Sequence, residues 1–152
     1  MAITLQASLP GAGASSNPSA TILVADDDSV VRMLLKAILV HSGYLVVEAQ
    51  DGAQTLAVVK ECCVQGVLLD VMMPKLDGFQ VCQRLKSDPS TAHIPVVLVT
   101  ALSTPEDRRQ GLDAGADGFI NKPVAPATLL SVVRQLMGDS QSRVGRVSVG
   151  SV

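Results

Sequence analysis

Short runs of aliphatic and β-branched residues alternate along the chain with longer segments in which apolar residues recur at helical spacing. The short runs predict five buried strands, and the longer segments predict five helices. The strands are expected at 21–25, 44–48, 66–69, 95–99 and 118–120, and the helices at 29–42, 52–62, 79–86, 105–114 and 126–137. Strands joined by crossover helices predict a parallel sheet covered on both faces. We therefore expect an α/β fold, a doubly wound three-layer sandwich.

Capping residues mark the ends of several predicted helices. Asp28 or Ser29 is the expected N-cap of the first helix, and Gly43 follows its end. A helix start is also clear at 104–107, where Thr, Pro, Glu and Asp follow one another. Asp51, Asp77 and Asp117 each precede a glycine, which is typical of turns.

The first predicted helix carries two apolar stripes. The one expected to face the core consists of Val31, Leu34, Leu35 and Ile38. A second stripe, partly exposed, consists of Met33, Ala37 and Val40, next to Arg32 and Lys36 on the outer side. One interpretation of the second stripe is extra packing under the residues that precede the first strand.

The size of the chain favours one domain. It has 152 residues, 47% of them hydrophobic but only 2% aromatic, so the core must consist mainly of Val, Leu, Ile and Ala. The domain is expected at 21–137. Residues 1–20 carry no charge and are expected to form a flexible leader, and 138–152 are expected to form a flexible tail or the start of a linker.

Charge and cysteine content exclude several classes of function. The net charge of −2 gives no reason to expect direct binding to nucleic acid or to a membrane. Cys62, Cys63 and Cys82 form no C-x-x-C pair, and neither His41 nor His93 has a neighbour suited to binding metal, so zinc and haem sites are not expected. Without a secretory signal or a membrane-length apolar run, the protein is expected to be cytoplasmic.

Polar residues with chemically useful groups follow the ends of the predicted strands, where ligands gather in such sheets. They are Asp26, Asp27 and Asp28 after the first strand, Asp70 after the third, Thr100 after the fourth and Lys122 after the fifth. Converging carboxylates repel one another unless they share a cation, and oxygen ligands favour Mg²⁺ or Mn²⁺. A metal, a carboxylate and a lysine together suit phosphoryl transfer. Asp28 is better explained as a helix cap than as a ligand.

Four motifs in order resemble the receiver domain of two-component response regulators, the CheY-like family. They are ILVADDD at 22–28, LLDVMMP at 68–74 followed by Asp77-Gly78, VLVTA at 97–101 and GADGFINKP at 115–123. The resemblance extends over about 21–137. It implies a flavodoxin-like fold with strand order 2-1-3-4-5 and a phosphorylation switch as the function.

The resemblance also assigns roles to the residues of the expected metal and phosphoryl site. Asp70 matches the phosphoacceptor and is also one of the metal's holders. Asp27 matches a direct Mg²⁺ ligand, and Asp26 an acid that holds the metal through water. Met72 matches the position whose backbone carbonyl binds the metal, and Lys122 the cation that pairs with the phosphoryl group.

Further positions match the switch of the family. Thr100 matches the hydroxyl that moves to the phosphoryl group, small Ala101 leaves access to it, and Phe119 matches an aromatic residue whose rotamer follows that of the threonine. The bond between Lys122 and Pro123 matches one that is usually cis in the family.

The same resemblance implies partners and a phosphoryl lifetime. A histidine kinase or histidine phosphotransfer protein is expected to dock on the first helix at Met33, Ala37 and Val40, and a target protein or output domain to receive the signal. Homodimers are common in the family. Met72 and Leu102 match positions that flank the attacking water, and because both are apolar, self-dephosphorylation should be slow.

Two alternatives to a phosphorylated switch stay open. One is a receiver that acts as an interaction module without phosphorylation. The other is a phosphatase of the haloacid-dehalogenase type, with Asp26 as nucleophile and Asp28 as acid, although Asp70 would then have no role. As a switch, the protein is not expected to be an enzyme, because it would catalyse only its own phosphorylation and dephosphorylation.

Overall fold

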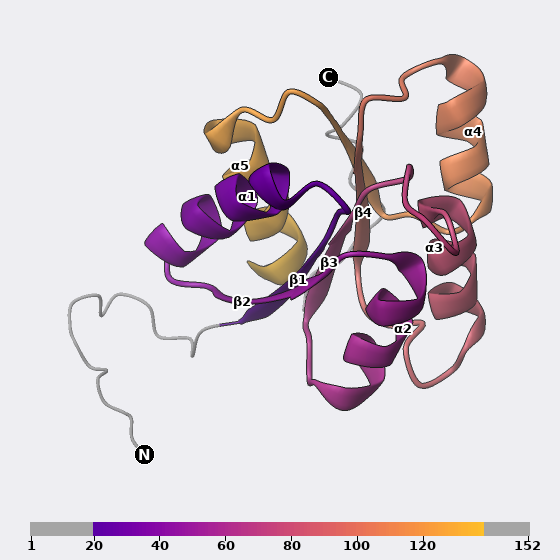
Figure 1. Cartoon of the computed structure of the whole chain (residues 1–152), viewed down its shortest axis with the longest axis horizontal. Helices are drawn as coiled ribbons and strands as arrows, with labels where there is room; N and C mark the ends of the chain where they lie inside the picture. Colours follow the sequence, from indigo (N-terminus) through magenta and orange to yellow (C-terminus); the bar gives the residue numbers. More distant parts are fainter. Residues whose placement is uncertain (1–19, 139–152) are drawn as a thin grey trace.

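The computed structural model describes residues 20–138, in which five strands alternate with five helices (Figure 1). The strands are β1 (Thr21–Ala25), β2 (Leu45–Ala49), β3 (Gly66–Leu69), β4 (Val96–Thr100) and β5 (Gly118–Asn121). The helices are α1 (Ser29–His41), α2 (Gly52–Glu61), α3 (Gly78–Ser87), α4 (Pro105–Asp113) and α5 (Pro126–Gly138). Every predicted element is therefore present, and each bound lies within one residue of the prediction.

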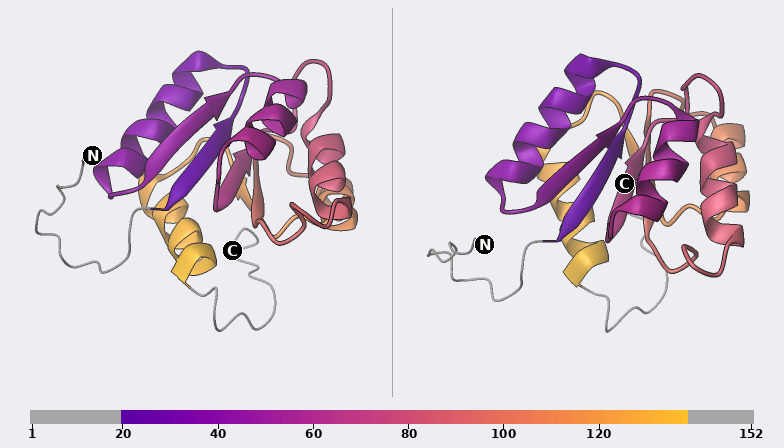
Figure 2. Two further views of the ribbon diagram at one scale, coloured as in Figure 1. Left: turned by 90° about the horizontal axis from the view of Figure 1, so that it is seen from below. Right: turned by 60° about the horizontal axis from the view of Figure 1, so that its bottom comes forward.

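All the strands belong to a single parallel sheet in the order β2-β1-β3-β4-β5. Figures 1 and 2 show that α1 and α5 cover one face of this sheet and that α2, α3 and α4 cover the other. In chain order, β2 is added on one side of β1, whereas β3, β4 and β5 follow on its other side. The carboxyl ends of β1 and β3 therefore border a crevice. The predicted doubly wound, flavodoxin-like sandwich is confirmed.

The core is divided by the sheet into two apolar layers. Along β1, Ile22 and Val24 pack toward α1 and α5, whereas Leu23 and Ala25 pack toward the helices on the opposite face. All four are almost completely buried. Because both faces of the strand are buried, every position between Thr21 and Asp26 is apolar.

Side-chain caps fix where the helices begin. The Asp28 carboxylate accepts hydrogen bonds from the N–H groups of Val30 and Val31, as expected for an N-cap of α1. Asp51 caps α2 and Asp77 caps α3. Both were predicted only as turn residues, so the structure gives them a more specific role. Each of these caps satisfies an N–H group that the first turn of a helix leaves without a partner.

The predicted core face of α1 is partly wrong. Leu35 and Leu39 are the buried residues of this helix, while Leu34 is 48% exposed. Val31 and Ile38 pack against the core at its margin, as predicted. Leu35 and Leu39 lie four residues apart and share a face, whereas Leu34 points away by about one quarter of a turn.

The predicted leader and tail lie outside the described residues, apart from residues 20 and 138. Within 20–138 no helix has the length and apolar character needed to cross a bilayer.

Candidate functional site

The strand ends bring the predicted site residues together at one edge of the sheet. Asp26 directly follows β1, Asp70 directly follows β3 and Lys122 directly follows β5, while Thr100 is the last residue of β4. The backbone N–H of Asp70 donates to the carbonyl of Ala25, so the neighbouring strands β1 and β3 fix the two acids in register.

Three carboxylates form the centre of the site. Oxygens of Asp26, Asp27 and Asp70 lie within 4.8 Å of one another. Asp26 and Asp70 are buried, and Asp27 is exposed. Three acidic oxygens at this spacing, without a nitrogen or sulfur donor, form a donor set that suits a hard divalent cation. The residues present therefore fit the predicted Mg²⁺ or Mn²⁺.

Lys122 contacts two of the three carboxylates. Its Nζ donates to Asp26 Oδ2 at 2.8 Å and is 3.5 Å from Asp70 Oδ1. Burial alone would lower the pKa of this amine, but the hydrogen bond to Asp26 and the charges of Asp70 and Asp26 raise it above its ordinary value. Lys122 is consequently a permanent cation beside Asp70.

Burial and the charge of Asp26 both oppose ionisation of Asp70, although Lys122 favours it. The pKa of Asp70 is raised to about 6, against the lowering effect of Lys122 and of the N–H groups of Met72 and Val71. A carboxyl group with this pKa is ionised at neutral pH but remains a better proton acceptor than an exposed aspartate. A cation at the acidic cluster would relieve the repulsion.

Two loops hold the acids in place. In the first, the Asp28 N–H donates to Asp26 Oδ1 at 2.9 Å while its side chain caps α1. In the second, the N–H of Gly78 donates to the carbonyl of Val71, and a Cβ at position 78 would lie only 2.4 Å from the carbonyl oxygen of Asp70. The start of α3 can approach Asp70 closely because residue 78 has no side chain.

The predicted switch residues lie between the site and α4. Thr100 is buried, and its Oγ1 accepts a hydrogen bond of 3.2 Å from the N–H of Leu102. Ala101 is exposed. The ring of Phe119 is buried, and the guanidinium carbon of Arg108 on α4 lies 5.1 Å from its centroid. The peptide bond between Lys122 and Pro123 is cis, as the resemblance implied.

A cleft of about 700 Å³ gives access to the acidic cluster. Asp27, Met72 and Leu102 are among the residues that line it. The Met72 side chain is 61% exposed, so its sulfur and methyl group point away from the core. The apolar character of positions 72 and 102, noted from the sequence, is thus present on the wall of the cleft that leads to the site.

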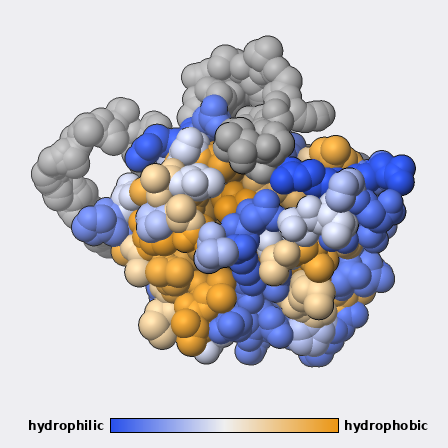
Figure 3. Space-filling view, turned by 90° about the horizontal axis from the view of Figure 1, so that it is seen from above, coloured by the Kyte–Doolittle hydropathy of each residue, from blue (hydrophilic) through white to orange (hydrophobic). Residues whose placement is uncertain are grey.

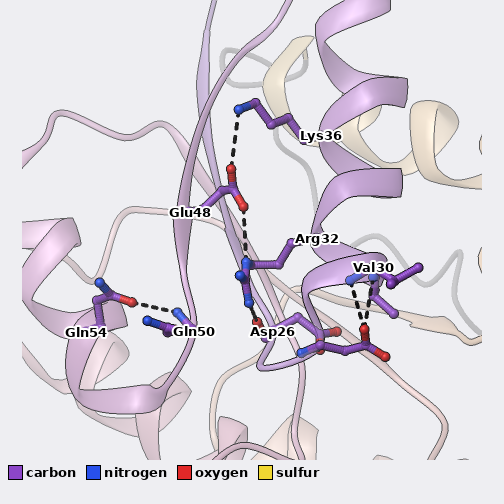
Figure 4. A network of polar contacts seen from close by, with 9 residues as sticks. Asp26, Val30, Arg32, Lys36, Glu48, Gln50 and Gln54 are labelled. Atoms are coloured by element: carbon purple, nitrogen blue, oxygen red, sulfur yellow. Dashed lines mark hydrogen bonds and ion pairs between the residues drawn. The ribbon is translucent and has the colours of Figure 1, made fainter.

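Sequence reasoning missed one contact with the loop after β1. Arg32 was expected on the outer side of α1, but its side chain is only 15% exposed and its Nη1 donates to the backbone carbonyl of Asp26 at 2.6 Å (Figure 4). Glu48 accepts from Nε of the same arginine at 3.1 Å. Helical spacing could have placed Arg32 one turn after Asp28, but no sequence pattern indicates a bond to a carbonyl.

Comparisons with known proteins agree with this geometry. Residues 22–134 match the response regulator receiver domain family. The chain is 49% identical over 118 residues to the response regulator PleD of Caulobacter vibrioides. The aligned residues are 78% of this chain and 26% of PleD. It is 42% identical over 116 residues to the transcriptional regulator RpaA of Synechocystis sp., covering 76% of this chain and 48% of RpaA. The chain thus spans about a quarter and about half of these two relatives.

Solved structures give the same result. A receiver domain of a histidine kinase from Syntrophus aciditrophicus superposes with a TM-score of 0.77 at 32% identity, covering 85% of this chain and 98% of that one. The receiver domain of the sensor histidine kinase PA1611 from Pseudomonas aeruginosa was solved with a magnesium ion in its active-site cleft. It superposes with a TM-score of 0.74 at 26% identity, and the match covers 79% of this chain and 98% of that one. The chain therefore belongs to the response regulator receiver domain family of two-component signalling.

Proposed function

We propose that this chain is a phosphorylation switch in which Asp70 accepts a phosphoryl group from a phosphohistidine donor, and that it catalyses only its own phosphorylation and dephosphorylation. The observation that carries the proposal is the setting of Asp70, a buried carboxylate of raised pKa between two other acids and a lysine. The relative from Pseudomonas aeruginosa, whose cleft holds magnesium, supports the same use of this site.

Each residue of the site has a distinct part in the proposed transfer. An oxygen of Asp70 forms the new bond to phosphorus as the bond between phosphorus and the donor imidazole breaks, and the released imidazole nitrogen takes up a proton from solvent. Lys122 offers a positive charge to the phosphoryl oxygens. Asp26, Asp27 and the carbonyl of Met72 would hold Mg²⁺ or Mn²⁺, which when bound supplies charge neutralisation for those oxygens.

The signal would leave the site through Thr100 and Phe119. The Thr100 hydroxyl must release the N–H of Leu102 before it can turn toward a phosphoryl group on Asp70. Its movement would free space next to the ring of Phe119 beneath α4. The surface around α4 and β5 would then change in response to phosphorylation, and a target protein or output domain would read this change.

A phosphoacceptor role predicts a covalent adduct that depends on one carboxylate. The purified chain, incubated with acetyl phosphate and Mg²⁺, should gain one phosphoryl mass, and Asp70→Asn or a chelator should abolish the gain. Asp28→Asn is the matched control, because asparagine also caps a helix and the variant should be phosphorylated normally.

The same measurement separates the alternatives. An adduct that survives Asp70→Asn but is lost with Asp26→Asn would support a phosphatase of the haloacid-dehalogenase type. Absence of any adduct, in wild-type protein that still binds the metal, would favour an unphosphorylated interaction module.

The exposed apolar residues of α1 support a docking site for the phosphodonor. Met33 is 66% exposed, Val40 is 51% exposed and Ala37 is exposed between them. Val30 and Leu34 extend this stripe, and Figure 3 shows apolar side chains gathered on the side of the molecule where Figure 1 places α1 and α5. An apolar stripe along a helix suits packing against a partner helix, as in a histidine phosphotransfer bundle.

A charge on this stripe should block transfer from a protein donor only. Met33→Glu combined with Val40→Glu should slow phosphorylation by a phosphotransfer protein at least tenfold, while phosphorylation by acetyl phosphate stays normal. Leu112→Glu is the matched control, because Leu112 is a comparably exposed apolar residue on α4. Unchanged transfer in the α1 variant would remove α1 as the docking site.

A further inference from the structure

Asp27 is the acid of the cluster whose direction depends most on the backbone. Its side chain is exposed, and within 20–138 no hydrogen bond or ion pair holds its carboxylate. Asp26, by contrast, is fixed by Lys122 and by the N–H of Asp28. The orientation of the Asp27 carboxylate is therefore set by the peptide that joins it to Asp26.

Bonds on both sides of Asp26 fix that peptide. The N–H of Asp26 donates to the carbonyl of Ala49 at the end of β2. Its carbonyl oxygen, which belongs to the peptide between Asp26 and Asp27, accepts the 2.6 Å bond from Arg32 Nη1. A bond from a cation to a carbonyl is stronger than a neutral one, and it is stronger still where water is largely excluded, as around this arginine.

Glu48 holds the arginine in this position. It lies on the β2 strand one residue before Ala49, and its Oε1 accepts from Arg32 Nε while its Oε2 accepts from Lys36 Nζ at 3.3 Å. Burial alone would raise the pKa of Glu48, but the bonds from Arg32 and Lys36 lower it, so the glutamate is ionised at neutral pH. Figure 4 shows the resulting chain of contacts from Lys36 through Glu48 and Arg32 to Asp26.

We propose that Arg32, oriented by Glu48, is a positioning residue that aims the Asp27 carboxylate at the acidic cluster and thereby sets its affinity for a divalent cation. This inference rests on the proposed function, because it requires the cluster to bind a metal. Arg32 touches neither the cation nor the phosphoryl group in this account. It acts through the peptide that carries the ligand, as groups behind metal ligands do elsewhere.

The test measures metal affinity directly, with Mn²⁺ as the probe and the electron paramagnetic resonance signal of free Mn²⁺ as the readout. Arg32→Gln in the full chain should weaken Mn²⁺ binding about tenfold or more, in line with the loss seen when second-layer partners of metal ligands are removed. Lys36→Gln is the matched control, since it removes the other cation of Glu48 and leaves the Asp26 carbonyl bonded; its affinity should stay within about twofold of wild type.

Two further variants address the geometry. Arg32→Lys should restore part of the affinity, because an ammonium group can reach the carbonyl but cannot bridge it to Glu48 with a planar fork. Glu48→Gln should weaken binding less than Arg32→Gln and should add no loss when both changes are combined, because the glutamate acts only through the arginine.

Unfolding in chelator separates positioning from simple stabilisation. A purely structural Arg32 would lower the resistance of its variant to urea and leave the Mn²⁺ affinity of the folded protein unchanged, which would overturn the inference. If wild-type protein itself bound no Mn²⁺, the proposed function would fail, and the inference about Arg32 would fail with it.

Discussion

Replacing Asp70 by asparagine should stabilise the protein in the absence of divalent metal, although it removes the proposed phosphoacceptor. The carboxylate is 5% exposed and is repelled by Asp26, whereas an amide of the same shape carries no charge. The pKa of about 6 lies above the ordinary value of 3.8. At about 1.4 kcal/mol per pH unit this difference corresponds to about 3 kcal/mol at neutral pH.

The value of about 3 kcal/mol is an upper limit on the gain in stability, because the variant also removes the favourable contact of Lys122 with Asp70. We therefore expect Asp70→Asn to raise the free energy of unfolding by about 1–3 kcal/mol at pH 7.5. The pKa of Asp70 is higher in the folded state than in the unfolded one. The free energy of unfolding of the wild-type protein therefore falls as the pH rises from about 4 to about 6, where Asp70 becomes ionised. The advantage of the variant should accordingly be small near pH 4 and constant above about pH 6.5.

Urea unfolding followed by circular dichroism suits this chain, which has no tryptophan. The titration is done in chelator at several pH values, with Asp28→Asn as a control whose stability should stay within about 0.5 kcal/mol of wild type. Adding Mg²⁺ should then favour the wild type, by about 2.7 kcal/mol at one hundred times its dissociation constant. A variant that is less stable than wild type in chelator at pH 7.5, or whose advantage is the same at pH 4, would refute the electrostatic reasoning.

Three other predictions concern the surroundings of the site. Gly111→Ala should destabilise the fold by about 1–3 kcal/mol in urea unfolding, because the new Cβ would lie 2.2 Å from the Phe119 ring and 2.9 Å from Leu98 Cδ1. The loss should be smaller in a Phe119→Ala background, which removes the closer contact. Met72→Asn with Leu102→Glu should speed loss of the phosphoryl group at least severalfold by giving the attacking water polar partners, and an unchanged decay of the adduct mass would count against this role. The thiol of Cys82, whose pKa burial raises to about 12, should resist maleimide at pH 8 in the folded protein and react after denaturation, as intact mass would report.

The sequence predicts which residues meet at one edge of the sheet, because the end of each strand can be recognised from the chain alone. Asp26, Asp70 and Lys122 each follow an apolar run, and a parallel sheet brings such positions to one edge. The predicted proximity is confirmed for these three residues by the contacts of Lys122 with both acids. Their roles in metal binding and phosphoryl transfer stay predictions.

Features that depend on side-chain direction were beyond the sequence pattern. Leu34 and Leu39 both fit an apolar helix, and only the placement of α1 on the sheet decides that the second is buried and the first is not. Arg32 was assigned to solvent because charged residues usually are exposed. Its bond to a backbone carbonyl requires the loop after β1 to pass within reach, which local spacing does not specify.

The ion pair between Lys122 and Asp26 joins residues that are 96 positions apart, from the strand that begins the sheet and the strand that completes it in chain order. During synthesis, the lysine leaves the ribosome only after nearly all of the domain has been made. A nascent or truncated chain that ends before β5 would have the acids but not the cation beside them. The positive charge that balances the acids of the first strand end therefore arrives with the last strand of the sheet.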